Sequence, residues 1–324
     1  MLTTVVGNYP RIGPDTRAPN LRTAIHQYER RRITQEELRQ VEDEVTREVI
    51  QEQVEAGIDL VTDGQVRWED SQTYFARRIR GMELDGLSRY FDTNTYYRRP
   101  VAKGKVEWQG PISVEDFRFA QSHSPRPVKP VVTGPYTLAR LSQLDSSTDL
   151  ASLVLDLAAI LNLEAQALEQ AGATIIQFDE PAILKHQEDF PLFRKAAKVL
   201  TRGLRAKTEL RTYFRDASGL APDLFRLPFQ VFGLDFAWGP RNYVLLQGFP
   251  GDKELVMGIM DARNTRLETV EELVEAVRRG ASHVALDRLS VSPSCGLEFL
   301  PRENARQKLV RLVEGARKAA EVLA

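Results

Sequence analysis

The sequence predicts an α/β protein in which parallel strands alternate with helices and close into a (β/α)8 TIM barrel with insertions. Three observations predict this class. Short β-branched and apolar runs alternate with longer segments of helical spacing along the chain. Eight such runs can be counted, which is the number in a closed barrel. The 324 residues exceed the roughly 250 of a typical barrel and leave room for insertions. We therefore expect residues 1–324 to form one domain.

The expected elements follow in order from these runs and from their end signals. Strands are expected at residues 3–6, 58–62, 129–133, 175–178, 209–214, 230–236, 255–260 and 283–287. Helices are expected at residues 34–56, 150–170, 192–206, 220–225, 269–279 and 303–322. Thr34 and Glu37 have the spacing of a capping box, and Gly57 and Gly172 end their helices. An open doubly wound sheet is the alternative fold, but no Gly-x-Gly-x-x-Gly follows the first strand.

One long segment, from about residue 81 to residue 127, fits neither the helical nor the strand period. It contains an aromatic cluster at residues 90–97, followed by the basic pair Arg98-Arg99. Long irregular segments inside compact domains are uncommon and often functional. We expect an irregular insertion here.

Composition and charge narrow the class of partner. Lysine plus arginine number 44 and aspartate plus glutamate 45, so nothing calls for nucleic acid or a membrane surface. A small molecule is the expected partner. The single cysteine, Cys295, excludes an intramolecular disulfide and fits a reducing compartment. The first residues lack the pattern of a signal peptide, and no run approaches the roughly 20 apolar residues of a membrane span. We expect a cytoplasmic location.

The run at residues 175–178 ends abruptly at Asp179-Glu180-Pro181, and proline cannot continue a ladder. In parallel α/β folds, ligands bind at the carboxyl ends of strands, so both carboxylates are expected at a pocket. A structural interpretation fits this tripeptide equally well: Glu180 would cap the next helix, and Asp179 would pair with an arginine.

Other expected strand ends carry polar residues too, and this favours ligand binding over a packing layer. They are Asn8, Arg11, Asp63, Gln65, Arg67, Thr133, Tyr213, Arg215, Asp235, Asp261, Arg263 and Cys295. Acids beside arginines suit a substrate that has both an amine and carboxylates. Taken alone, Arg67 or Arg263 is better explained by a salt bridge to a neighbouring acid.

The residue types and their spacing give little support for a metal site or for a catalytic cysteine. Zinc needs three or four ligands, and no second cysteine exists. The four histidines, at residues 26, 123, 186 and 283, are scattered without motif spacing. No histidine base is predicted beside Cys295, so a small buried hydrophobic residue is the better interpretation of it.

Six motifs occur in order along nearly the whole chain. They are Val6-Gly7-Asn8-Tyr9-Pro10-Arg11-Ile12-Gly13, Thr62-Asp63-Gly64-Gln65, Phe91-Asp92-Thr93-Asn94, Val132-Thr133-Gly134-Pro135-Tyr136-Thr137, Gln177-Phe178-Asp179-Glu180-Pro181-Ala182 and Pro293-Ser294-Cys295-Gly296-Leu297. Together they resemble the cobalamin-independent methionine synthase family, here in a single-barrel form. The resemblance implies methyl transfer to the thiol of homocysteine from 5-methyltetrahydrofolate, or from a methyl-corrinoid in some short members. It also implies zinc that activates the thiol.

The departures from that family concern its metal site. The resemblance places Tyr213 and Arg215 where the catalytic barrel has a His-x-Cys zinc pair, and Asp235 where it has a glutamate ligand. Only Cys295 matches a zinc ligand, and Arg263 stands where a histidine shuttles protons. We therefore expect no complete set of metal ligands in this chain and assign no cofactor to it.

The substrate contacts of the family are carried over only in part. Asn8 and Gln65 replace residues that hold the homocysteine carboxylate and amine, whereas Asp179 is retained as an amine partner. The expected substrate-binding residues are Asn8, Arg11, Gln65, Thr133, Asp179, Glu180, Tyr213, Arg215, Asp235 and Arg263.

Several motifs look more like the zinc-free amino-terminal barrel of the long enzymes, which helps to bind the polyglutamate tail of the folate. Three hypotheses follow. In the first, the chain is a methyltransferase, alone or with a zinc-bearing sister chain. In the second, it is a non-catalytic half that binds folate or a partner. In the third, it is a metal-independent enzyme on a uroporphyrinogen decarboxylase-like barrel. Two measurements distinguish the three hypotheses. They are the zinc content of the purified chain and the methylation of homocysteine with and without a second chain.

Overall fold

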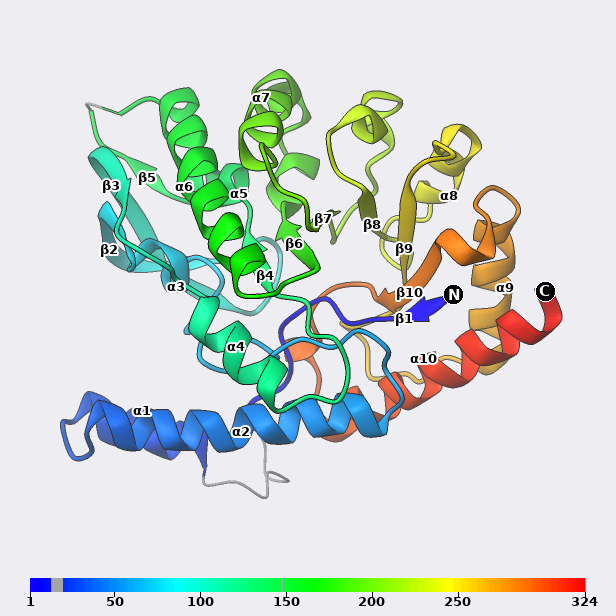
Figure 1. Cartoon of the computed structure of the whole chain (residues 1–324), viewed down its shortest axis with the longest axis horizontal. Helices are drawn as coiled ribbons and strands as arrows, with labels where there is room; N and C mark the ends of the chain where they lie inside the picture. Colours follow the sequence, from blue (N-terminus) through cyan, green and yellow to red (C-terminus); the bar gives the residue numbers. More distant parts are fainter. Residues whose placement is uncertain (13–19, 147, 324) are drawn as a thin grey trace.

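A parallel sheet of seven strands forms the centre of the computed structural model, which describes residues 1–12, 20–146 and 148–323. The strand order is β1 (Leu2–Thr3), β10 (Leu289–Pro293), β9 (Glu254–Met260), β8 (Val231–Asp235), β7 (Lys207–Arg211), β6 (Ile175–Asp179) and β4 (Val131–Thr133). Every neighbouring pair is parallel. The sheet curls, with helices on its outer side (Figure 1).

Residues 60 and 61 lie between the two edge strands, β1 and β4. Isolated parallel bridges join Thr4 to Leu60 and Val61 to Val128. The Asp59 carboxylate accepts hydrogen bonds from both the backbone N–H and the hydroxyl of Thr3, each at 2.9 Å. The strand expected at residues 58–62 is therefore present as bridges rather than as a full ladder.

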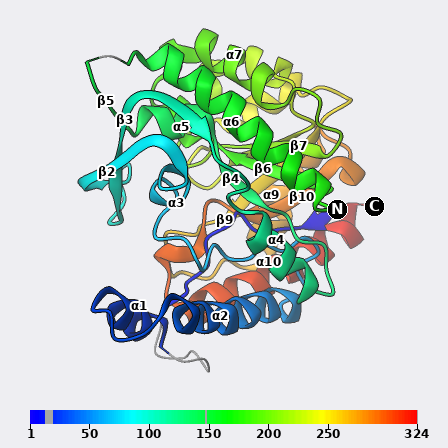
Figure 2. The same ribbon diagram turned by 60° about the vertical axis from the view of Figure 1, so that its left-hand side comes forward.

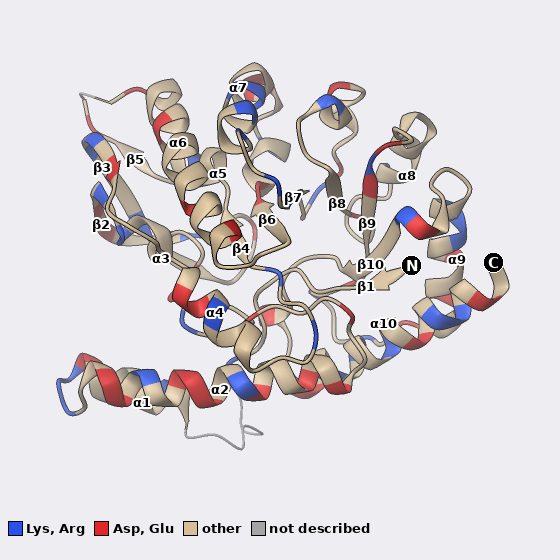
Figure 3. Cartoon of the chain, viewed as in Figure 1, with Lys and Arg blue, Asp and Glu red and all other residues tan. Residues whose placement is uncertain are grey.

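The long helices lie close to their expected positions. They are α2 (Gln35–Glu55), α6 (Leu150–Gln170), α7 (Phe190–Leu200), α9 (Val270–Ala281) and α10 (Arg302–Leu323). The capping box of Thr34 and Glu37 is confirmed. Charges of both signs cover the outer faces of α2 and α10, as expected for solvated helices (Figure 3). The helix expected at residues 192–206 ends earlier, because the chain turns through Gly203 at φ +76°.

Shorter elements complete the fold. They are α1 (Leu21–Glu29), α3 (Thr73–Ala76), α4 (Val114–Ser122), α5 (Pro135–Arg140), α8 (Asn242–Leu245) and the 3-10 turns η1 (Pro181–Leu184), η2 (Gln187–Asp189), η3 (Ser218–Leu220), η4 (Asp223–Arg226), η5 (Leu246–Gly248), η6 (Leu286–Arg288) and η7 (Leu297–Phe299). The helix expected at residues 220–225 is replaced by the end of η3 at Leu220 and by η4, which contains the buried residues Leu224 and Phe225.

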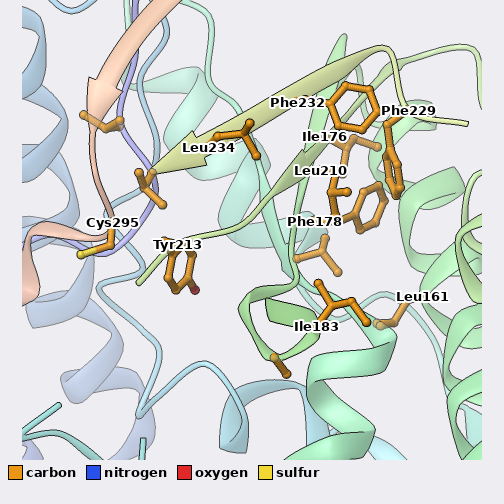
Figure 4. Close-up of a cluster of buried hydrophobic side chains, with 14 of the residues drawn as sticks. Leu161, Ile176, Phe178, Ile183, Leu210, Tyr213, Phe229, Phe232, Leu234 and Cys295 are labelled. Carbon is orange, nitrogen blue, oxygen red and sulfur yellow. The ribbon is translucent and has the colours of Figure 1, made fainter. Parts of the chain in front are cut away.

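Helix α6 is long and apolar enough to cross a membrane by length and composition, although 44% of that window is buried inside the fold. Asp156, Asn162 and Glu164 interrupt its apolar residues, so it is not a continuous apolar run. Its buried residue Leu161 belongs to the main core together with the sheet residues Ile176 and Phe178 (Figure 4). The same composition describes the core helix of a soluble protein.

The expected irregular insertion is wrong for much of its length. Strands β2 (Ile79–Arg89) and β3 (Tyr96–Trp108) form a long antiparallel hairpin, which β5 (Gln143–Leu144) extends to three strands. This small sheet lies apart from the main sheet (Figures 1 and 2). Two register shifts, one at Gly81 with φ +85°, break the alternation by which a strand is recognised in sequence.

The last strand was also misplaced. Residues 283–287 were expected to form it, but β10 begins at Leu289, and residues 286–288 form the turn η6. Val284 is buried because it packs into the core from the turn after α9, not because it belongs to a strand. Its apolar character therefore misled the periodicity argument.

Candidate functional site

The tip of the β2–β3 hairpin lies against the loops that follow the carboxyl ends of β7 and β9. Phe91 contacts Phe214, with ring centroids 5.7 Å apart. The backbone carbonyl of Asp92 accepts a hydrogen bond from Arg263 at 3.2 Å, and the Asp92 carboxylate pairs with Arg215 at 3.5 Å. Both phenylalanines have positive φ, +49° and +77°, which is uncommon for bulky residues. Such backbone conformations cluster at functional sites.

Asp179 lies beneath this cover at the end of β6. One carboxylate oxygen accepts from the Gln177 side chain at 2.6 Å, and the other accepts from the Tyr213 hydroxyl at 3.2 Å. The Tyr213 hydroxyl is also 3.2 Å from that of Tyr90, on the hairpin. Burial raises the pKa of Asp179 to about 7. Asp179 is therefore linked to the hairpin through the hydroxyl groups of Tyr213 and Tyr90.

Glu180 has a structural task in this fold. Its carboxylate oxygens accept from the backbone N–H groups of Tyr136 and Thr137, at 2.9 and 2.7 Å, at the start of α5. A Cβ on Gly134 would lie 2.2 Å from the Glu180 Cδ, so only glycine leaves room for this carboxylate. Glu180 therefore caps a helix, as the structural interpretation expected, but the helix is α5, which precedes it, and not the next one. Thr133 donates from its hydroxyl to the Ser71 carbonyl at 2.6 Å.

Asp235 and Arg11 are also occupied by backbone groups. Asp235 accepts from the N–H groups of Phe214, Ala237 and Trp238 at 2.8 to 3.0 Å. Arg11 donates to the carbonyls of residues 66, 68 and 69. Burial lowers the pKa of the Arg11 guanidinium. These side chains hold loops in place at the strand ends.

Gln65 and Asn8 lie close together near the carboxyl end of β1, where the Gln65 side chain is next to Gly7. Gln65 has φ +53°, and its Oε1 is buried without a hydrogen-bond partner in the described part of the chain. Asn8 donates from Nδ2 to an oxygen of Glu298 at 3.4 Å. Arg67 forms ion pairs with Asp43 at 2.6 Å and Asp116 at 3.0 Å, which confirms its expected salt bridge.

A cavity of about 420 Å³ opens next to Asn8. Its lining mixes strand-end, loop and hairpin residues: Asn8, Arg11, Arg22, Trp68, Glu69, Tyr90, Tyr96, Tyr97 and Glu298 are among them. Of the predicted substrate-binding residues, it brings together Asn8 and Arg11. Arg215, Tyr213 and Arg263 instead line a much smaller hollow of about 30 Å³ beside Phe91. The predicted set is therefore divided by the hairpin tip.

Glu298 was missed by the sequence reasoning. It lies in η7, three residues after Cys295, so the only signal was its place directly behind the last motif. Burial raises the pKa of Glu298 to about 8. One of its oxygens faces Asn8, and the other, Oε2, is buried with no hydrogen-bond partner among the described residues.

A buried charge cluster below the site was missed as well. The Lys129 ammonium lies 2.8 Å from Glu209, and the Arg211 guanidinium lies 2.9 Å from the same carboxylate. All three side chains are almost completely buried. Burial disfavours the charged form of Glu209, but the two cations outweigh it and lower the pKa. The signal in the sequence was the pair of charged residues at 209 and 211, two positions apart around the apolar Leu210 and so on one face of the strand.

The positions that resemble the family's zinc ligands do not fit the metal. Tyr213 is bonded to Asp179, Arg215 carries a positive charge beside Asp92, and Asp235 is occupied by three N–H groups. Burial, together with Glu298 and Asp235, raises the pKa of the Cys295 thiol well above its usual value. Within residues 1–12, 20–146 and 148–323, no group of three His, Cys, Asp or Glu side chains could hold a metal ion.

A second large cavity, of about 610 Å³, lies between α1, α2 and the hairpin. Six arginines line it, at positions 11, 39, 67, 77, 78 and 98. It shares Arg11, Trp68 and Glu69 with the first cavity. Four acids line it as well, at positions 29, 42, 69 and 116, and Arg39, Arg67 and Arg77 form ion pairs with acids. Arg98 is an exposed guanidinium of this lining and is suited to bidentate contact with a carboxylate.

Comparison with known proteins gives consistent results over the full length. A family model described as "Cobalamin-independent synthase, Catalytic domain" matches residues 1–318. Methionine synthase of Saccharolobus solfataricus is 35% identical over 326 residues, covering 99% of this chain and 95% of that protein. Methionine synthase of Sulfurisphaera tokodaii is 35% identical over 324 residues, covering 99% and 93%.

A solved structure shares the fold. The B12-independent methionine synthase from Shewanella sp. W3-18-1, in complex with selenomethionine, superposes with a TM-score of 0.85 at 24% identity and covers 99% of this chain and 98% of that one. The matching family model is that of the catalytic domain, although several motifs are similar to the zinc-free half. The chain belongs to the cobalamin-independent methionine synthase family.

Proposed function

We propose that this chain is a methyltransferase that acts in the transfer of a methyl group to the thiol of homocysteine. The observation that carries the proposal is the full-length match to proteins named methionine synthase, at 35% identity over 99% of the chain. The cavity beside Asn8 supports it, because it lies at the carboxyl ends of the strands, where parallel α/β enzymes bind substrates.

The chain is proposed to need a second chain that carries zinc. The support is chemical: Arg215 and Tyr213 occupy positions where thiolate and imidazole would be required, and an arginine repels a divalent cation. The methyl donor would be 5-methyltetrahydrofolate or a methyl-corrinoid. What this chain contributes is a cavity that binds and orients a small molecule at the strand ends.

A combined metal and activity assay tests this proposal. The purified chain is analysed for zinc, and methionine formation is measured with each methyl donor, with and without a zinc-bearing homologue. We expect substoichiometric zinc and activity only in the mixture. Stoichiometric zinc with activity of the chain alone would overturn the need for a second chain. The absence of methionine in every mixture would overturn the methyltransferase proposal.

A second candidate is a non-catalytic half that binds folate, and the arginine-lined cavity favours it. The carboxylates of a polyglutamate tail would suit its guanidinium groups, of which Arg98 is among the exposed ones. Binding of 5-methyltetrahydrofolate with one and with three glutamates distinguishes this role. Tighter binding of the longer form, lost in Arg98→Ala and weakened by salt, is expected if the cavity holds the tail.

The architecture and location are proposed in the same terms. Residues 58–62 would complete an eight-stranded barrel between β1 and β4, supported by the bridges at Leu60 and Val61. The whole chain, residues 1–324, would be one domain of a cytoplasmic protein. Its partners would be small molecules and the zinc-bearing sister chain, without nucleic acid or membrane.

A further inference from the structure

Three features of Glu298 indicate a role in binding a ligand rather than in stabilising the fold. It lines the cavity beside Asn8, its side chain is partly buried, and its Oε2 atom is buried without a hydrogen-bond partner among the described residues. An unpaired buried carboxyl oxygen costs free energy unless a ligand supplies the missing donor. The other acids of this cavity are occupied: Glu69 pairs with Arg77 at 2.9 Å, and Asp70 accepts from the backbone N–H of Gln72 at 2.8 Å.

The surrounding chain keeps the Glu298 carboxyl in this position. Asn8 donates to Oε1 at 3.4 Å, so the group is held from one side only. A Cβ on Gly296 would lie 2.1 Å from Oε2, so the absence of a side chain at this position leaves room for the oxygen. Both neighbours belong to loops that follow strands, Asn8 after β1 and Gly296 after β10, whose pairing is parallel.

We propose that Glu298 binds the ammonium group of the amino-acid substrate, and that it thereby determines the selectivity of the cavity for amines. The inference rests on the proposed function, because homocysteine and methionine are the ligands concerned. Gln65 is a neutral amide and cannot pair with an ammonium as a carboxylate does. Asp179 is already bonded to Gln177 and Tyr213. Glu298 is the acid of this cavity that retains an unpaired buried oxygen.

The rest of the cavity suits the remainder of such a ligand. Trp68, Tyr90 and Tyr97 supply aromatic surface, which makes favourable contacts with a thioether or thiol sulfur. Arg22 adds a positive charge for the carboxylate. A divalent metal ion is a poor alternative, because it requires several oxygen ligands, and Arg11 lies in the same lining.

Calorimetric binding of two ligands tests the proposal. L-methionine carries the amine, whereas 4-(methylthio)butanoate has the same chain without it. The wild type is expected to prefer methionine by about ten- to a hundredfold, the range of a charged hydrogen bond. In Glu298→Gln this preference should fall at least about tenfold, with little change for the amine-free ligand. The control is Glu271→Gln, an exposed glutamate on α9 that should leave both affinities unchanged.

A second variant covers a possible folding defect of the first. Gly296→Ala keeps the carboxyl group of Glu298 but displaces it, so this variant too should lose the preference for methionine. If the wild type prefers methionine and both variants keep that preference, Glu298 does not bind the amine, and the proposed function stands. If the wild type binds neither methionine nor homocysteine, the proposed function fails and this inference fails with it.

Discussion

The buried cluster of Lys129, Glu209 and Arg211 gives the sharpest test of how the curled sheet is held together. One carboxylate faces two cations, at 2.8 and 2.9 Å, in an interior that excludes water. Glu209→Gln keeps the shape of the side chain but removes the only negative charge of the cluster. Two buried cations then remain without a counter-charge, and this is a costly arrangement.

The expected loss of stability is about 3 to 5 kcal/mol, the usual cost of breaking a buried ion pair by removing one partner. Lys129 can reduce this cost by losing its proton, because burial already lowers the pKa of its ammonium. The folded variant would then bind fewer protons than the unfolded chain, so its stability should rise with pH. We therefore expect Glu209→Gln to be less destabilised at pH 9 than at pH 6.

Lys129→Met is the matched comparison. It leaves Glu209 and Arg211 as a balanced pair, so we expect a loss below about 2 kcal/mol, which reflects local repacking. Urea unfolding of the three proteins at pH 6 and pH 9, followed by circular dichroism, measures the difference. The reasoning is refuted if Glu209→Gln unfolds within about 1 kcal/mol of the wild type, or if Lys129→Met is equally damaging.

Three further predictions concern the cover, the site and the strand ends. Arg263→Ala removes the cation that stacks on Trp238 and donates a hydrogen bond to the hairpin tip. Limited proteolysis should then cut the hairpin several-fold faster than in the wild type. An unchanged cleavage rate would show that Arg263 does not hold the hairpin in place. Glu298 has a folded pKa of about 8, above its unfolded value, so its contribution to stability is present at low pH and lost as pH rises towards 8. Relative to Glu298→Gln, the wild type should lose about 1 to 3 kcal/mol between pH 5 and pH 9, and a constant difference in urea unfolding would contradict this. Gly134→Ala would place a methyl group against the Glu180 carboxylate, so the free energy of unfolding should fall by about 2 kcal/mol or more. Thermal unfolding measures this loss, and an unchanged melting temperature would exclude the clash.

The sequence predicted the strands of the main sheet well where a buried apolar run ended at a polar residue. Residues 175–178 and 255–260 lie within β6 and β9 because their apolar character came from burial on both sides of a parallel sheet. The β2–β3 hairpin could not be found in the same way. Its alternation is interrupted at two register shifts, and only pairing with β3 reveals it.

The site was harder to predict than the fold because an acid at a strand end has two possible uses. Glu180 and Asp235 look like ligand-binding residues in sequence, yet backbone N–H groups occupy their oxygens. Those donors come from residues 21 or more positions away for Tyr136, Thr137 and Phe214, so no local pattern reports them. Glu298, in contrast, carried no motif of its own, and its unpaired oxygen is visible only in three dimensions.

The hairpin decides which of the carboxyl ends of the sheet strands are left open. Its tip packs on Phe214 and bonds to Arg263, so it covers the ends of β7 and β9, while Tyr90 extends the contact to Tyr213 and thus to Asp179. The large cavity is left beside Asn8 and Glu298, with Tyr90 in its wall. A ligand in that cavity would therefore touch a residue of the cover directly. Because Tyr90 and Tyr213 share one hydrogen bond, movement of the hairpin and the environment of the Asp179 carboxylate must change together.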